Sequence, residues 1–481
     1  MASPANATDH PITCDGSTTG QLNTLMTTTN FTQGDTVTIT GICVGDTFIF
    51  PGLTFQNHTN PSVLSGTDGI EGMLTLNGNS VATTQIEGLT LEGAPSDNGD
   101  QANLHVTGGS VLNLSNSEVK LAQRDGIDVD ENSSLTLQDT QIDGNGVANV
   151  NGKNNGIRVK KGGIVNDNSG AANSTIHNNT GFGLHAEGAY VELANTDMNT
   201  DTLSEIGAFG TYLNLGGGTI TATGSLPAVQ VIQASSVTLV GVTISGPAGG
   251  VMAASATGLL LAHATISTTS TTVPAVEATS ASSLIITGGD AITASSGTAI
   301  EIDHSSSLLH QLLSRLDPGS GNAAESITGK GTILMQSSAD LGQGPLTPPP
   351  PGAGPAPPTP SAVFSIVWNG PISVGQNSAI RMQSGVHVTG AVQISAASNG
   401  YFNCNNNGNS CSGAGAANEI DGTVQCLELL ATPANPSVHV SNPQLIVNSS
   451  LAADSGVAVA NLFGASSFAT STPAANTCLN F

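Results

Sequence analysis

The chain has 481 residues, of which 34 are Asp or Glu and only 9 are Lys or Arg, so its formal net charge is −25. A charge of this sign repels phosphate backbones and anionic lipid surfaces, so we expect no nucleic-acid partner. Aromatic residues make up 3% of the chain, so the core must be built from Val, Ile, Leu and Ala. No run of about 18 apolar residues is present, so we predict no membrane span.

The six cysteines gather near the two ends of the chain, with Cys14 and Cys43 in the first part and four in the last quarter: Cys404, Cys411, Cys426 and Cys478. An even set in this arrangement favours disulfide bonds made in an oxidising compartment, with unpaired buried thiols as the alternative. We therefore predict a secreted or cell-surface protein. The opening residues 1–3 lack the basic and apolar regions of a signal peptide, which indicates that the natural signal has been removed.

Residues 1–50 have the pattern of an N-terminal cap. In Gln21–Met26 the apolar side chains Leu22, Leu25 and Met26 share one face of a predicted short helix. A strand is predicted at Val37–Ile39, followed by Cys43. A lid of this kind would cover strand edges at the open end of a stack, which otherwise invite aggregation.

Residues 51–340 form a repeat array in which short apolar segments recur with a period in the low to mid twenties. The first column of segments begins at Leu104, Ile127, Ile157, Leu184, Phe209, Val229, Val251, Val276 and Ile300. The second contains Val111, Leu135, Val191, Val237, Leu259 and Leu284. The third contains Val119, Ile142, Ile176, Met198, Ile220, Ile244, Ile266 and Ile292. Three columns with one period predict a three-sided coil that buries one short strand on each face.

This periodicity resembles the right-handed, single-stranded parallel β-helix of the pectin-lyase-like superfamily, and the unit from Cys14 to Cys43 is similar to the capped entry of its secreted members. The resemblance implies an all-β fold with an N-terminal cap. It covers roughly residues 12–340.

The rest of the chain breaks the period. Leucines at helical spacing in residues 306–316 predict a small amphipathic helix closed by Pro318-Gly319. Residues 345–360 are rich in Pro, which cannot donate hydrogen bonds to a central sheet, so we predict an extended linker. Residues 361–481 predict a small disulfide-stapled β domain, or a few further coils of the same kind.

The first column carries ionisable residues in the middle of its early segments. If the segments stack in register, His105, Asp128, Arg158 and His185 form an outward column. Continuing the alternation adds Asp130, Lys160 and Glu187. Together with Tyr190, an aromatic residue nearby, the residues His105, Asp130, Lys160 and Glu187 are the candidate ligand-binding residues.

Two segments of this column, Asp125-Gly126-Ile127-Asp128 and Arg158-Val159-Lys160, resemble motifs of polygalacturonases. The resemblance implies Asp128 as an acid or base and Arg158 as a partner of a substrate carboxylate, and His185 completes the candidate catalytic set. A lyase would use calcium, for which Asp125, Asp128 and Asp130 are the candidate ligands.

Three interpretations of the column remain open. In the first, the charges pair across strands and only fix their register. In the second, the protein acts in adhesion, glycan binding or extracellular assembly, with a glycan, a cell surface or a second copy of itself as partner. In the third, it is a lyase or glycoside hydrolase acting on a uronic-acid polysaccharide.

Overall fold

The computed structural model describes residues 7–78, 82–93, 102–147, 154–168, 173–287, 290–294 and 298–302, together with short strands between residues 307 and 470. The fold is a parallel β-solenoid, as the repeat predicts. The chain forms two compact units, residues 1–248 and 249–481. No helix in the described parts is long and apolar enough to cross a membrane.

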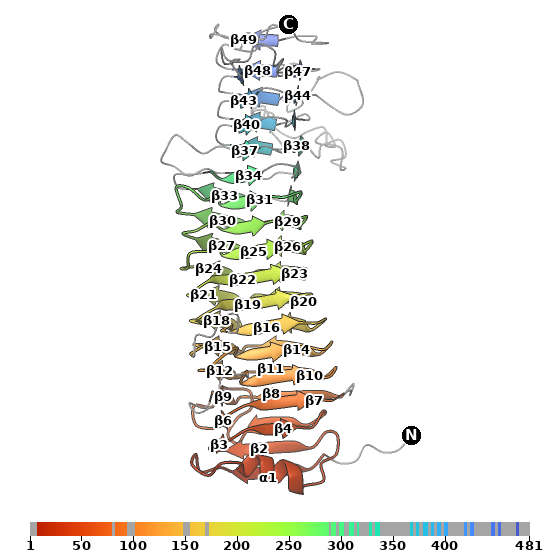
Figure 1. Ribbon diagram of the computed structural model, residues 1–481, viewed down its shortest axis with the longest axis vertical. Helices are drawn as coiled ribbons and strands as arrows, with labels where there is room; N and C mark the ends of the chain where they lie inside the picture. The colour runs from red at the N-terminus through yellow and green to blue at the C-terminus, as the bar shows by residue number, and fades with distance from the viewer. Residues whose placement is uncertain are drawn as a thin grey trace, which may run out of the picture. The chain divides into compact units, whose positions relative to one another are not determined.

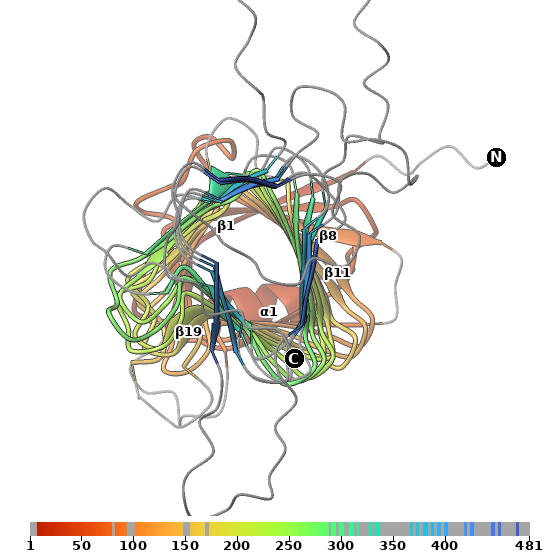
Figure 2. The same cartoon turned by 90° about the horizontal axis from the view of Figure 1, so that it is seen from above.

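The predicted cap is present at the start of unit 1. Helix α1 (Gln21–Thr28) buries Leu22 and Met26, and strand β1 (Asp9–Thr13) pairs in parallel with β2 (Thr36–Thr40). Viewed along the coil, α1 lies across its interior (Figure 2). A disulfide joins Cys14 to Cys43, whose Cα atoms are 4.9 Å apart. The predictions of a cap helix, a strand and an N-terminal disulfide are therefore confirmed.

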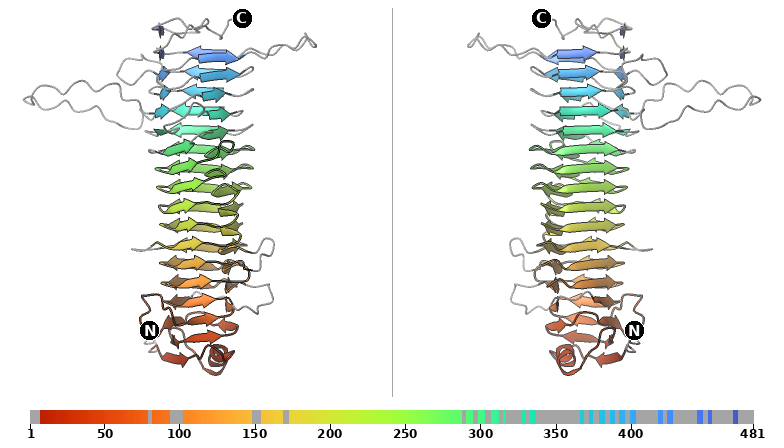
Figure 3. Two further views of the ribbon diagram at one scale, coloured as in Figure 1. Left: turned by 90° about the vertical axis from the view of Figure 1, so that its left-hand side faces the viewer. Right: turned by 90° about the vertical axis from the view of Figure 1, so that its right-hand side faces the viewer.

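Unit 1 contains three parallel sheets, here called A, B and C, and each coil contributes one strand to each sheet (Figures 1 and 3). Sheet A consists of β1, β2, β5 (Thr54–Asn57), β8 (Thr83–Glu87), β11 (Val111–Ser115), β14 (Ser134–Gln138), β17 (Ile164–Asp167), β20 (Tyr190–Ala194), β23 (Tyr212–Gly216) and β26 (Ser236–Val240). Sheet B consists of β3 (Ile42–Val44), β6 (Gly69–Glu71), β9 (Thr90–Glu92), β12 (Glu118–Lys120), β15 (Gln141–Asp143), β18 (Thr175–His177), β21 (Asp197–Asn199), β24 (Thr219–Thr221) and β27 (Thr243–Gly246). Sheet C consists of β4 (Thr47–Ile49), β7 (Leu74–Asn77), β10 (Leu104–Thr107), β13 (Ile127–Val129), β16 (Ile157–Lys160), β19 (Phe182–Glu187), β22 (Ser204–Phe209) and β25 (Val229–Ile232).

Alternation along each strand decides which side chains enter the core. In β13, for example, Ile127 and Val129 are fully buried and Asp128 between them points outward. Because successive strands pair in register, the inward positions stack as continuous columns of aliphatic residues. The third predicted column is confirmed within each unit, from Val119 to Ile244 in unit 1 and at Ile266 and Ile292 in unit 2.

Two predicted column positions are wrong. In β22 the residue in register with Leu184 and Val229 is Ile206, whereas Phe209 lies three residues later and is partly exposed. The prediction failed because Ile206-Gly207-Ala208 lacks the polar centre of the other segments. In β11 the buried residue in register with Leu135 is Leu112, not Val111.

Unit 2 repeats the plan of three parallel sheets. The strands of one sheet are β28 (Val251–Ala253), β31 (Val276–Ala278), β34 (Ile300–Ile302), β37 (Ile327–Gly329), β40 (Ile372–Val374), β43 (Val392–Ser395) and β46 (Val424–Leu427). Those of the second are β29 (Gly258–Ala262), β32 (Ser283–Thr287), β35 (Ser307–Gln311), β38 (Thr332–Gln336), β41 (Ala379–Met382), β44 (Asn399–Phe402) and β47 (Gln444–Val447). Those of the third are β30 (Thr265–Thr268), β33 (Ala291–Ala294), β36 (Arg315–Leu316), β39 (Ile366–Trp368), β42 (Val386–Val388), β45 (Asn418–Ile420), β48 (Leu451–Ala453) and β49 (Phe468–Thr470).

The amphipathic helix predicted at residues 306–316 is wrong, because the segment supplies strands β35 and β36. Leu308 pairs with Leu284 of the preceding coil, so a Leu-rich run that also fits a helix continues the sheet instead. Strand pairing within the stack outweighs the local preference.

Strand β36 pairs in parallel with β39, which follows the Pro-rich stretch. The linker at residues 345–360 lies outside the described residues, and so do the side chains of Cys404, Cys411, Cys426 and Cys478. The boundaries of the last two predicted domains stay predictions.

Candidate functional site

The predicted outward column is present on sheet C. His105 pairs in register with Asp128, Asp128 with Arg158, and Arg158 with His185. Neighbouring strands lie about 4.8 Å apart, so residues as far apart in sequence as His105 and His185 share one surface. We call this surface the sheet C patch; it comprises His105, Asp125, Asp128, Asp130, Arg158, Lys160, His185 and Glu187.

The shortest ion pair in the patch, between Lys160 and Asp128, runs diagonally across the strand register. Lys160 Nζ lies 2.7 Å from Asp128 Oδ2 and 3.8 Å from Asp130 Oδ2. Asp130 is 5% exposed, and its Oδ1 lies 3.4 Å from His105 Nε2. Lys160 therefore faces one carboxylate of the adjacent strand β13 and one of the turn that follows it. These contacts hold the side chains in fixed positions.

Asp125 has a structural role in addition to its place in the patch. Its Oδ1 accepts hydrogen bonds from the backbone N–H and the side-chain amide of Asn155, at 2.9 and 2.8 Å. Arg158 Nη1 lies 3.9 Å from its other oxygen. Burial raises the pKa of Asp125 to about 6, although the hydrogen bonds from Asn155 and the charge of Arg158 oppose this shift.

His185 lies between two aromatic rings. Its ring stacks on that of Phe182 with centroids 5.3 Å apart, and meets Phe209 edge-on at 5.2 Å. Burial lowers the pKa of His185, and the charge of Arg158 adds to the effect, so the imidazole is neutral at pH 7. The next position of the column is Gly207, where a Cβ would approach Phe182 Cε1 to 2.7 Å. Gly207 thus leaves the space that the Phe182 ring fills.

One predicted residue, Tyr190, does not lie on the sheet C patch. Glu187 does, exposed at the end of β19 and in register with Lys160. Tyr190 belongs to sheet A, where it stacks on Tyr212 at 4.8 Å and donates a hydrogen bond to Glu192. The structure adds aromatic residues that we did not place in the site: Phe209, and Phe48, which is 62% exposed and precedes Thr75 and His105 in the column.

A group of side chains close enough to hold a metal ion lies in the patch. One ligand atom from each of His105, Asp128 and Asp130 lies within 4.8 Å of the others. The predicted calcium ligands Asp128 and Asp130 belong to this group. Asp125 is not in the group, and its Oδ1 accepts hydrogen bonds from Asn155.

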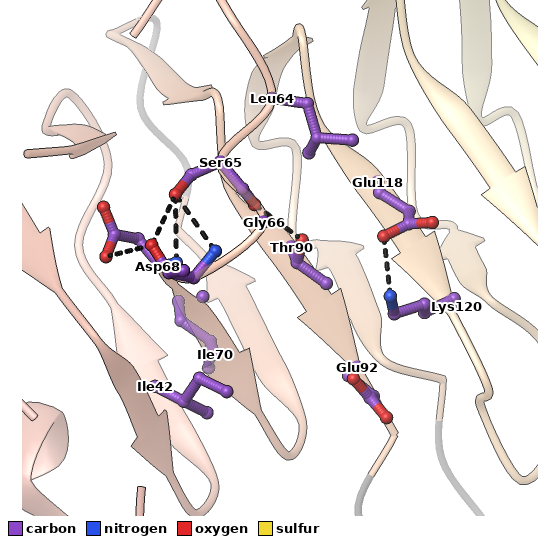
Figure 4. A pocket seen from close by; sticks show the side chains of 12 residues that line it. Ile42, Leu64, Ser65, Gly66, Asp68, Ile70, Thr90, Glu92, Glu118 and Lys120 are labelled. Carbon is purple, nitrogen blue, oxygen red and sulfur yellow. Dashed lines mark hydrogen bonds and ion pairs between the residues drawn. The ribbon is translucent and has the colours of Figure 1, made fainter. Parts of the chain in front are cut away.

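Sequence reasoning missed a second site, a cavity of about 250 Å³ on sheet B. Ile42 and Ile70 form its apolar part, and Leu64 and Ser65 come from the loop that connects β5 to β6 (Figure 4). Glu118 and Lys120, 2.8 Å apart, lie at the other side.

The buried side chain of Asn57 holds the start of this loop. The Asn57 amide donates to the backbone oxygens of Asn60, Val63 and Gly88. The signal that could have revealed the cavity is the length of the loop between β5 and β6, but its fold over the sheet depends on tertiary contacts.

A buried carboxyl pair, Asp201 and Glu205, was also missed. Glu205 is fully buried within β22. Burial, together with the neighbouring carboxyl of Asp201, raises the pKa of Glu205 to about 10, so the side chain is protonated at neutral pH. Asp201 Oδ1 accepts hydrogen bonds from the backbone N–H and the side chain of Asn179.

Comparison with known proteins finds no relative. No protein-family profile matches the chain, no curated protein matches its sequence, and no solved structure matches it. The function must therefore be argued from the site.

Proposed function

We propose that this is a secreted or cell-surface protein with a right-handed β-helix of the pectin-lyase-like type, which acts in adhesion by binding a glycan on the sheet C patch. The observation that carries the proposal is the ion pair of Lys160 with Asp128 on an outward face flanked by aromatic rings. The N-terminal disulfide supports the extracellular location.

The chemistry of the patch suits sugar hydroxyls. A hydroxyl both donates and accepts hydrogen bonds, and paired carboxylates and cations present acceptors and donors at adjacent fixed positions. The rings of Phe182 and Phe209 add apolar surface next to His185. Because the side chains are already held by their ion pairs, little conformational entropy is lost on binding.

The charge of the patch favours a neutral glycan. Asp125, Asp128, Asp130 and Glu187 outnumber Arg158 and Lys160, and the chain as a whole carries −25. A polyanion would meet net repulsion, whereas an uncharged sugar does not.

A glycan array probed with the full chain tests the proposal. Asp128→Asn and Lys160→Met should each weaken binding by at least about tenfold, the cost of a charged hydrogen-bond partner. Glu118→Gln is the matched control, because Glu118 makes an ion pair of similar length with Lys120 on sheet B. Binding to no glycan and to no cell surface, together with no self-association in light scattering, would rule out the proposal.

A second candidate function is cleavage of a uronic-acid polysaccharide, favoured by the raised pKa of Asp125 beside Arg158. A carboxyl with a pKa of about 6 is suited to proton transfer near neutral pH. Incubation with pectate and alginate, followed by reducing-end and ultraviolet assays, tests it. Cleavage should be lost in Arg158→Ala and Asp125→Asn, and absence of cleavage on every uronan would exclude this candidate.

A further inference from the structure

Four polar atoms on the sheet C patch are buried without a hydrogen-bond partner in the described part of the chain: Arg158 Nε, His105 Nε2, Asp128 Oδ1 and Asp130 Oδ1. The last three belong to residues whose ligand atoms lie within 4.8 Å of one another. Buried polar atoms normally have partners, because loss of water without a replacement is unfavourable. Three such atoms in one cluster are polar groups that a bound ligand would satisfy.

Lys160, the cation that pairs with Asp128 and Asp130, does not contact the Oδ1 atom of either carboxylate. Lys160 lies next to Oδ2 of Asp128 and Oδ2 of Asp130, so Oδ1 of each carboxylate is not engaged by the ammonium. Asp130 Oδ1 lies instead toward His105 Nε2, at 3.4 Å. Lys160 thus orients the carboxylates from one side and leaves the other side open.

The spacing suits a small metal ion. Two ligands about 2.1 Å from a tetrahedral metal are about 3.4 Å apart, which is the separation of His105 Nε2 and Asp130 Oδ1. The third ligand atom, from Asp128, lies within 4.8 Å of the others. His105 and Asp128 are adjacent in the sheet register, and Asp130 follows two residues after Asp128, so the backbone fixes the set.

We propose that His105, Asp128 and Asp130 form a binding site for a divalent transition metal of the zinc class, to which the protein supplies three ligands. An imidazole nitrogen with two carboxylates suits zinc, cobalt or manganese. Calcium prefers six to eight oxygen ligands, and magnesium an octahedron of oxygens, which three protein ligands do not supply. The inference rests on these side chains alone and does not require glycan binding.

Calorimetric titration of the full chain after EDTA treatment and dialysis tests the site. We expect one bound Zn²⁺ per chain and no comparable binding of Ca²⁺. Co²⁺ should give visible absorption bands typical of a four-coordinate nitrogen and oxygen site. His105→Ala, Asp128→Asn and Asp130→Asn should each lower the Zn²⁺ affinity by at least about tenfold.

His177→Ala is the matched control, because His177 Nδ1 lies 3.2 Å from Asp143 Oδ1 on sheet B, in a pair that forms no group of three metal-binding side chains among the described residues. This variant should bind Zn²⁺ as the unmodified protein does. Circular dichroism checks that each variant is folded. No Zn²⁺ binding at millimolar concentration would overturn the proposal and leave a simple His105–Asp130 ion pair. Unchanged affinity in folded His105→Ala would overturn it as well.

The titration contains no sugar, so its result does not depend on the glycan proposal. Zinc binding without glycan binding would refute only the proposed function. Glycan binding that survives EDTA, in a chain that takes up no Zn²⁺, would refute only the metal site.

Discussion

At the scale of single residues, neighbouring residues on adjacent coils determine the positions of the side chains in the sheet C patch. Gly207 shows this for an aromatic contact, because the ring of Phe182 occupies the space where a Cβ would be. Asp125 shows it for a charge, because Asn155 fixes one of its oxygens from the next coil. The chemistry of the patch therefore depends also on Gly207 and Asn155, which carry no charge themselves.

Gly207→Ala should displace the Phe182 ring and separate it from His185. Overpacking of this kind destabilises a protein by about 1–3 kcal/mol. Urea unfolding measures the loss, and the NMR signal of the His185 imidazole, which the stacked ring shifts, should move. Gly66→Ala is the control, since a Cβ there meets no atom within 4 Å. An unchanged imidazole signal would show that the ring does not depend on Gly207.

Glu205→Gln should stabilise the protein at alkaline pH. In the unfolded chain Glu205 loses its proton near the ordinary value of 4.5, whereas burial and Asp201 raise its pKa in the native state to about 10. Between these two pKa values, the native state binds more protons than the unfolded chain. The free energy of unfolding therefore falls as the pH rises from about 4.5 to about 10. Glutamine does not titrate, and this decline should disappear.

Urea unfolding at pH 5, 7 and 9 measures the effect. The advantage of Glu205→Gln over the unmodified protein should be small at pH 5 and grow toward pH 9. Glu192→Gln, on the outer face of sheet A, is the control and should show no such trend. A parallel pH dependence in the unmodified protein and Glu205→Gln would contradict a protonated Glu205.

At the scale of the element, buried ladders of side-chain amides join the turns of successive coils. Asn145 donates its backbone N–H and its side-chain amide to Asn179 Oδ1, at 3.1 and 3.0 Å. Asn179 in turn donates to Asp201 Oδ1. Because both asparagines are fully buried, these bonds satisfy backbone groups that no strand partner reaches.

Asn179→Ala should lower the stability of unit 1 by about 3 kcal/mol, since it leaves two buried donors of Asn145 without an acceptor. Urea unfolding measures the change, and hydrogen exchange should accelerate at the amide of Asn145. Asn214→Ala, on the outer face of β23, should change stability by less than about 0.5 kcal/mol. Equal effects of the two substitutions would show that the hydrogen bonds of the ladder do not contribute to stability.

At the scale of the whole molecule, a chain with few aromatic and charged residues obtains its stability from repetition. Each coil adds the same three short strands, and columns of Ile, Leu and Val fill the interior of each unit. The first coil is exceptional because it has a neighbour on one side only. Helix α1 and the disulfide from Cys14 to Cys43 close that end of unit 1.

Replacement of both Cys14 and Cys43 by Ser should destabilise unit 1 by about 3–4 kcal/mol, as expected for loss of a cross-link between residues 29 positions apart. Urea unfolding measures the loss. Dithiothreitol should bring the unmodified protein toward the midpoint of the double variant and leave the variant itself unchanged. A double variant as stable as the unmodified protein would show that α1 closes the end without the cross-link.

The sequence by itself determined the parallel coil, its cap and the outward column from His105 to His185. This was possible because the spacing of apolar residues shows both the two-residue alternation within a strand and the longer repeat from coil to coil. Sequence reasoning misplaced Phe209 in the column, because Gly207 stands where the other segments have a polar residue. It also predicted a helix at residues 306–316, because the Leu-rich run there fits the spacing of a helix as well as that of a strand.

Only the tertiary structure decided the partners of the charged residues. The diagonal pair of Lys160 with Asp128, the hold of Asn155 on Asp125 and the burial of Glu205 depend on side-chain directions in neighbouring coils. The same is true of the convergence of His105, Asp128 and Asp130. A repeat fixes which residues share a face, but the hydrogen bonds and burial on that face arise from contacts between segments far apart in the chain.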